Sequence, residues 1–233
     1  MNNFLNYWRS LDWSALTDML ENIIPSLLCI TLHELAHGFV AYKLGDDTAK
    51  RAGRLTLNPV RHIDLFGLLM MIVFRFGWAK PVPVDMRNFK NPKRGMALTA
   101  LAGPLCNFIL CCFFLFVYGL LFYPLYPLSV GGSAMADFVL TLVMRTAYIS
   151  LALGVFNLIP IPPLDGSKVV FSLLSDGAYE KLMRYERFGM LILFALIGSR
   201  ILGAPLSSAT QWLFDRLFNI AELGFDLVKR IAA

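Results

Sequence analysis

Long apolar stretches are the feature that most constrains this chain. Four of them meet or approach the roughly 20 residues that a helix needs to cross a bilayer. They are Asn22–Tyr42, Ala97–Tyr123, Phe138–Pro160 and Phe188–Ala204. The last two each carry one arginine, Arg145 and Arg200, placed near enough to one end to snorkel. With 57% hydrophobic and 16% charged residues, the chain is predicted to be an integral membrane protein rather than a soluble, disordered or disulfide-stapled one.

Three other segments are apolar only in part. Leu65–Phe74 is ten residues long, which favours a re-entrant or interfacial piece over a span. Residues 1–20 mix tryptophans and leucines with charges, which predicts an interfacial N-terminal helix. Gln211–Ile231 is similarly mixed, so we expect an amphipathic helix that either lies on the membrane or packs on the bundle.

Basic residues predict the orientation of these spans. More than half of the 21 lysines and arginines lie between the first two spans, and residues 124–137 contain none. Residues 161–187 again carry four, namely Lys168, Lys181, Arg184 and Arg187. Because cytoplasmic loops are enriched in Lys and Arg, the first and third connections are expected in the cytoplasm. No nucleic-acid partner is expected, since no aromatic-basic binding motif accompanies the charge.

The sequence His33-Glu34-Leu35-Ala36-His37 lies inside the first span. Residues i and i+4 of a helix face the same way, so both imidazoles can reach one metal ion, with Glu34 beside them as a candidate general base. Ionisable residues in a spanning segment are costly unless a partner or cavity receives them. The alternative, a pair of histidines at the headgroup boundary, explains less of the pattern.

Two histidines leave a catalytic zinc site one protein ligand short, and His62 and the carboxylates are the candidates. Asp165 follows a proline-broken stretch, Pro160–Pro163, at the same depth as the histidine pair, which favours it over a simple turn residue. We interpret His62 as an interfacial or structural residue. Asn107 lies one or two turns into the second span, either as a helix-packing contact or as a hydrogen-bond donor into the site.

These motifs together resemble the site-2 protease family of intramembrane zinc metalloproteases. The resemblance rests on His33–His37, on the Gly-Pro-x-x-Asn of Gly103–Asn107, and on the Asn-x-x-Pro-x-x-x-x-Asp-Gly of Asn157–Gly166. It covers roughly residues 20–170 and is nearest to the compact bacterial members, since neither a PDZ nor a CBS domain is recognisable. Gly77–Val82 resembles the family's Gly-x-x-x-Pro-Val element, against which the substrate is thought to add as a strand.

The resemblance implies one Zn²⁺ held by His33, His37 and Asp165, with Glu34 as the catalytic base. It also implies that Asn157 and Asn107 contact the substrate backbone or the developing oxyanion. The expected fold is an all-α polytopic membrane protein: a three-helix catalytic core over residues 21–170, and a further membrane helix and an amphipathic helix over 171–233. A small membrane-associated β element is expected near residues 54–84.

The expected activity is zinc-dependent hydrolysis of a peptide bond in or near the transmembrane helix of a membrane-anchored protein. The expected location is a bacterial plasma membrane, with the site towards the cytoplasm and control by a membrane partner or by prior cleavage of the substrate. A zinc transporter and an inactive helix-binding relative are the alternatives. The transporter needs sites in both halves of the membrane, and the inactive relative would be expected to lack the base or a ligand.

Overall fold

The computed structural model describes residues 13–74, 79–185, 188–199 and 201–232. Its helices are α2 (Trp13–Lys43), α3 (Thr48–Arg51), α4 (Leu65–Phe74), α5 (Pro92–Val130), α6 (Ala134–Asn157), α7 (Asp165–Ser172), α8 (Asp176–Tyr185), α9 (Gly189–Gly198), α10 (Gly203–Leu217) and α11 (Asn219–Ala232). Two short 3₁₀ turns, η1 (Pro59–Arg61) and η2 (Met86–Asn88), lie in the connections. The predicted all-α class is confirmed.

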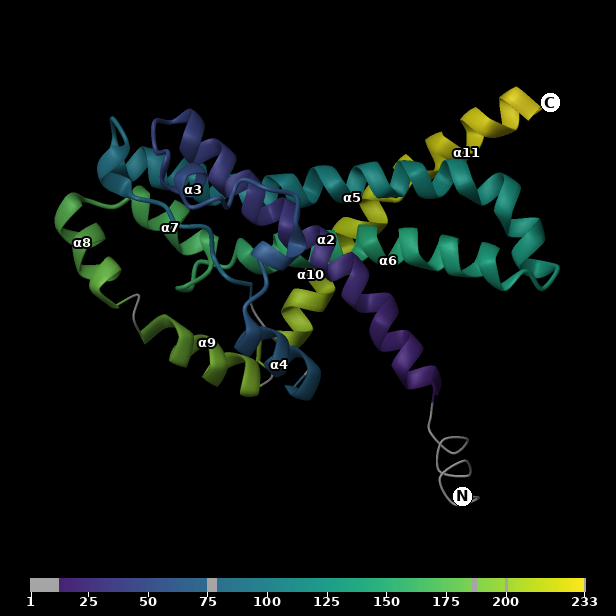
Figure 1. The fold of residues 1–233 in the computed structure, drawn as a ribbon, viewed down its shortest axis with the longest axis horizontal. Helices are drawn as coiled ribbons and strands as arrows, with labels where there is room; N and C mark the ends of the chain where they lie inside the picture. The colour runs from purple at the N-terminus through teal and green to yellow at the C-terminus, as the bar shows by residue number, and fades with distance from the viewer. Residues whose placement is uncertain (1–12, 75–78, 186–187, 200, 233) are drawn as a thin grey trace, which may run out of the picture.

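Three long helices, α2, α5 and α6, pack on one another and form the centre of the molecule (Figure 1). Each contains a segment long and apolar enough to cross a membrane: Glu21–Lys43, Pro92–Val130 and Ala134–Asn157. Large apolar side chains such as Ile109 and Phe113 stay exposed on α5, as expected for a surface that faces lipid. These helices correspond to the first three predicted spans.

Local sequence explains where the α5–α6 hairpin begins and turns. The Asn91 side chain accepts a hydrogen bond from the Arg94 N–H and caps α5. Between the helices, Gly132 has a φ of 91°, a backbone conformation that favours glycine, and Ser133 then caps α6. The hairpin therefore lies at one end of the pair, and α3, α7 and α8 gather at the other (Figure 1).

The carboxyl-terminal helices pack against the α5–α6 pair. Leu115, Leu151 and Phe214 belong to a buried cluster that joins α5, α6 and α10. At the α5–α11 crossing the two backbones touch: a Cβ on Gly119 would lie 1.9 Å from the Ala221 carbonyl oxygen, and one on Gly224 would lie 2.4 Å from that of Phe116. Small residues permit such close approach. The amphipathic carboxyl-terminal segment therefore packs on the bundle and is divided between α10 and α11.

Two expectations are modified by the structure. The stretch Phe188–Ala204 is divided, because α9 ends at Gly198 and the helical segment that begins at Gly203 is bent from it by 87°; the two pieces together are long and apolar enough for one broken span or a re-entrant loop. Glycines flank the break and Pro205 follows it, and both residue types disfavour a continuous helix.

The expected β element is smaller than predicted. Within the described residues 54–74 and 79–84 it consists of a single antiparallel bridge between Ile63 and Ala79. Pro81 and Pro83 lack the N–H groups that would extend it. Part of the Gly77–Val82 motif, and the first twelve residues of the expected N-terminal helix, lie outside the described residues. Residues 13–20 are continuous with α2.

Candidate active site

The imidazole rings of the two histidines of α2 lie in contact, with their planes at 90° to each other. His33 and His37 are 4% and 8% exposed, their ring centroids are 4.5 Å apart, and the Nε2 atoms approach to 3.0 Å. One helical turn separates the residues, so the sequence spacing itself produces this pairing. Both imidazoles direct Nε2 towards the same point.

Asp165 reaches that point from the first residue of α7. Its Oδ2 lies 3.1 Å from the Nε2 atoms of both His33 and His37. The chain arrives there through the irregular segment 158–164, and α7 begins tight against the end of α6: a Cβ on Gly166 would lie 2.2 Å from the Leu158 carbonyl oxygen. The glycine after Asp165 therefore allows the approach that brings the carboxylate to the histidines.

The three donor atoms fit a zinc ion. They form a triangle with edges of 3.0, 3.1 and 3.1 Å, and tetrahedral zinc with bonds of about 2.0–2.1 Å separates its ligands by about 3.3 Å. Two imidazoles and one carboxylate are a known donor set of catalytic zinc, which keeps the fourth position open. Across the part of the chain that the structure describes, this is the one group of three buried ligand-type residues so arranged.

Gly103 of α5 provides the space for the two rings. A Cβ at this position would lie 2.5 Å from His37 Cε1 and Nε2 and 2.6 Å from His33 Cε1. Any side chain there would push the imidazoles from their places. The glycine of the Gly-Pro-x-x-Asn motif is thus explained by the ligands that it faces.

The outer nitrogens of both rings contact α5. His37 Nδ1 lies 2.7 Å from the Thr99 carbonyl oxygen, and His33 Nδ1 lies 3.0 Å from the Asn107 side-chain amide. Contacts of this kind orient metal-binding imidazoles. Asn107 is fully buried, at 0% exposure.

Glu34 is half-buried next to the histidines and contacts the 79–88 segment, which ends in η2. Its Oε2 accepts a hydrogen bond of 2.9 Å from the Val82 N–H. Sequence reasoning did not find what holds this segment in place. Arg54 donates to the Lys80 carbonyl oxygen, at 2.6 Å.

Asp46, fully buried, is the second anchor of the segment. It accepts 2.7 Å hydrogen bonds from the Asp85 N–H and the Asn88 side chain. An aspartate in the short turn three residues after the end of α2 was the available signal. Burial raises the pKa of the Asp46 carboxyl group, but the hydrogen bonds that it accepts outweigh burial and hold the pKa below its ordinary value.

The side chains of Asn157 and His62 both contact backbone carbonyl oxygens. Asn157 is half-buried and donates to the Leu153 carbonyl oxygen of its own helix, at 3.0 Å. His62 is buried, its Nε2 lies 2.9 Å from the Thr56 carbonyl oxygen, and its own carbonyl accepts from the Lys80 N–H. His62 therefore organises the loop before the 79–88 segment.

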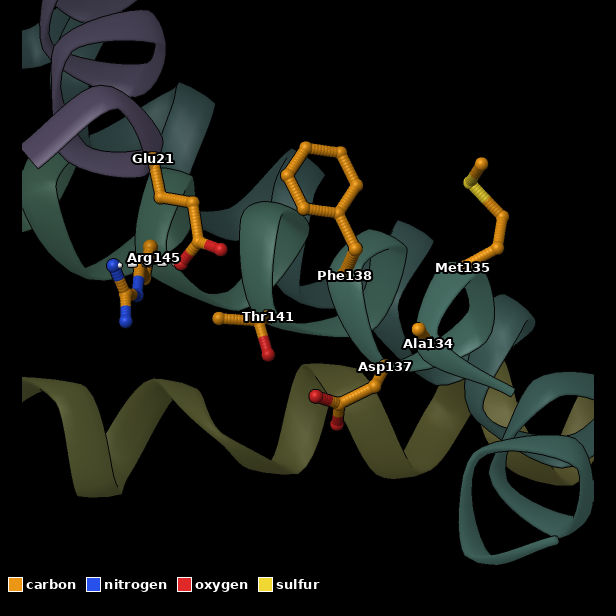
Figure 2. Close-up of a pocket in the computed structure, with 7 residues that line it drawn as sticks. All are labelled: Glu21, Ala134, Met135, Asp137, Phe138, Thr141 and Arg145. Atoms are coloured by element: carbon orange, nitrogen blue, oxygen red, sulfur yellow. Dashed lines mark ion pairs between the residues drawn. The ribbon is translucent and has the colours of Figure 1, made fainter. Parts of the chain in front are cut away.

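Arg145 does not stand alone in its span. Its Nη1 lies 3.0 Å from Glu21 Oε2, in a cavity of about 600 Å³ between the start of α2 and the first half of α6 (Figure 2). Glu21 precedes His33 by twelve residues, about 18 Å along the helix. This ion pair is a separate feature from the histidine–aspartate group.

Two buried histidines and an aspartate, with a glutamate beside them, are typical of the active site of a zinc hydrolase, and here they lie in a core of membrane-length helices. The comparisons with known proteins agree. The model of Peptidase family M50 matches residues 124–198. "Putative zinc metalloprotease YwhC" of Bacillus subtilis is 38% identical over 91% of this chain and 90% of its own length. "Putative zinc metalloprotease Rip2" of Mycobacterium tuberculosis is 29% identical, over 81% of this chain and 71% of its own length.

A more distant relative, "Zinc metalloprotease MJ0392" of Methanocaldococcus jannaschii, is 26% identical over 72% of this chain and 36% of its own length. No solved structure matches. The chain belongs to Peptidase family M50, the site-2 protease family, and is a zinc metalloprotease.

Proposed function

We propose that this chain is an intramembrane endopeptidase that hydrolyses a peptide bond in or near the transmembrane helix of a membrane-anchored protein. The observation that carries the proposal is the depth of the site. His33 and His37 lie ten and six residues before Lys43, where α2 ends, which is about 15 and 9 Å along the helix. With the end of α2 at the surface of a hydrocarbon layer of about 30 Å, the buried group would lie below that surface, and this supports the proposal.

We assign His33, His37 and Asp165 as the ligands of one Zn²⁺, and Glu34 as the general base. Bound zinc would supply Lewis-acid polarisation of the scissile carbonyl and a lower pKa for water. Glu34 takes the proton of the attacking water and returns one to the leaving nitrogen. Its Oε2 is fixed by the Val82 N–H, so we assign Oε1 to the proton transfer. Asn157, near the end of α6, is the residue we assign to the substrate backbone.

The site also needs a route for water and an unwound substrate. Backbone carbonyls in a helix are held by i→i−4 hydrogen bonds, so a substrate helix must open locally before attack. The irregular backbone of residues 158–164 and the polar connection that follows α2 border the site, and irregular backbone at such depth is tolerated where it lines a cavity. The basic connections lie at the same end of the bundle, so we place the site towards the cytoplasm of a bacterial plasma membrane.

A zinc transporter is the less favoured function. A permeation path needs ligand groups in both halves of the membrane, whereas the structure, over its described residues, gathers one such group. At the other end of α2 lies the Glu21–Arg145 ion pair, which carries no histidine.

The test is quantitative proteomics of membrane fractions from cells that produce the wild type, Glu34→Gln or Glu222→Gln. The last is a matched control, because Glu222 is exposed on α11, far along the chain from the site. We expect a membrane-anchored protein to be cut with the wild type and with Glu222→Gln, and to stay intact with Glu34→Gln, which still binds zinc. Persistent cleavage with Glu34→Gln would remove Glu34 from its role.

The purified enzyme tests control by a partner or by prior trimming. We expect the purified enzyme to cut a pre-trimmed form of its substrate faster than the full-length form. Equal rates on both forms, with no other protein added, would contradict this expectation.

A further inference from the structure

The two zinc-site histidines differ in what faces their outer nitrogens. His37 Nδ1 lies 2.7 Å from a backbone carbonyl oxygen, that of Thr99. A carbonyl only accepts hydrogen bonds, so His37 must carry its proton on Nδ1, which leaves a lone pair on Nε2. His37 is therefore fixed in the tautomer that binds a metal through Nε2.

His33 faces an amide that can act in either sense. The Asn107 Nδ2 lies 3.0 Å from His33 Nδ1, and in this arrangement Nδ1 accepts and Nε2 carries the proton. That proton points towards His37 Nε2, at 3.0 Å, and Asp165 Oδ2, at 3.1 Å.

The other half of the same amide is left unused. Asn107 Oδ1 is buried and accepts no hydrogen bond from any described residue. An unpaired buried acceptor costs about 1–3 kcal/mol. Rotation of the amide by 180° would place this oxygen against His33 Nδ1, in nearly the same volume.

Packing fixes the position of Asn107 but not the direction of its amide. The backbone carbonyl oxygen of Asn107 accepts a 2.9 Å hydrogen bond from the buried Ser150 hydroxyl group of α6. Gly154 allows the close fit, since a Cβ there would lie 3.2 Å from Asn107 Cβ. A side chain at 0% exposure, enclosed between α2, α5 and α6, contacts His33 and is not open to a substrate.

We propose that Asn107 is a positioning residue for the metal: its side-chain oxygen accepts the His33 Nδ1–H, which leaves Nε2 free to bind zinc. The proposal rests on the proposed zinc site. It changes the role that the motif resemblance implied for Asn107, from a group that contacts the substrate to one that acts through a ligand. Contacts of this kind are worth about 10–100-fold in metal affinity.

The test measures zinc affinity without substrate, by competition with a chelator, in three variants. Asn107→Leu removes the acceptor, and we expect the dissociation constant for zinc to rise about 10–100-fold, with a changed absorption spectrum of the cobalt-loaded protein. Asn107→Asp keeps an acceptor and no donor, so we expect affinity near that of the wild type. Thr146→Val is the matched control, a buried polar side chain of α6 whose hydroxyl group bonds within its own helix.

The Asp variant separates the two roles. A group that donates to the oxyanion would not be rescued by a carboxylate and would leave zinc affinity unchanged on substitution by Leu. Wild-type zinc affinity and an unchanged cobalt spectrum in Asn107→Leu would overturn the proposal. If His33→Ala also kept zinc, the zinc site itself would be wrong, which is a different failure.

A measurement on the wild type covers the case in which Asn107→Leu does not fold. The chain has three histidines, so ¹⁵N-labelled imidazoles can be assigned individually. In the zinc-loaded protein we expect the Nδ1 atoms of both His33 and His37 to carry protons. An unprotonated His33 Nδ1 with zinc bound would contradict the proposal.

Discussion

Gly103→Ala is the substitution whose consequence the structure states most directly. The new Cβ would lie 2.5 Å from two atoms of the His37 ring and 2.6 Å from His33 Cε1, whereas ordinary contacts begin near 3.4 Å. The rings must therefore move by about 1 Å. Zinc sites hold their ligand distances within about 0.2 Å, and a 1 Å misplacement can cost about 100-fold in rate. We expect zinc affinity to fall at least about tenfold and proteolysis about 100-fold.

Gly119→Ala is the matched control in the same helix. Its Cβ would meet the Ala221 carbonyl oxygen at 1.9 Å, a more severe clash, but sixteen residues away, about 24 Å along α5. Overpacking of this kind costs about 1–3 kcal/mol of stability. Chelator competition on folded, purified protein should show zinc lost from Gly103→Ala and kept by Gly119→Ala. Wild-type zinc affinity in Gly103→Ala, or equal loss in both variants, would refute the reasoning.

Three further predictions follow from the surroundings of the site. Asp46→Asn should increase hydrogen exchange and proteolysis over residues 80–88, whereas Asp47→Asn, at a half-exposed side chain that pairs with Arg51, should not; unchanged protection would mean that Asp46 is no anchor. The fold lowers the pKa of Asp46, so the stabilisation that its ionised carboxylate gives to the 80–88 segment is complete above the ordinary carboxyl pKa of about 4 and is lost as the pH falls below that value. Protection of this segment from exchange should therefore be constant from pH 7 to about 4 and then decline. A double-mutant cycle on Glu21 and Arg145 should give a coupling of about 1 kcal/mol in thermal unfolding with zinc content unchanged, and a zinc loss in either single variant would connect this pair to the site.

Local sequence predicts the parts of this site that lie within one element. The His33–His37 spacing places both rings on one face of a helix, and the structure shows them there. Asp165, far along the chain, could be chosen because the spans alternate in direction and prolines break the chain at the same depth. The motif glycine at position 103 was visible, but its reason, the two rings that it faces, needed coordinates.

Contacts between distant segments could not be predicted in the same way. The pairing of Arg145 with Glu21 was not predicted, because helix packing decides which two polar residues meet. Asp46 lies in a turn that any helix end can have, and only the structure shows the segment that it holds. The break after α9 was in the sequence, since Gly198, Gly203 and Pro205 mark it.

The most direct test of the central claim is X-ray absorption at the zinc edge on the purified protein, with zinc content measured for the wild type, His33→Ala and Asp165→Asn. The account predicts one zinc per chain, bound by two imidazole nitrogens and carboxylate or water oxygen at about 2.0–2.2 Å, and much less zinc in both variants. A sulfur shell at about 2.3 Å would instead assign the metal to cysteines, of which the chain has four. That result, or full zinc content in both variants, would contradict the assignment of His33, His37 and Asp165.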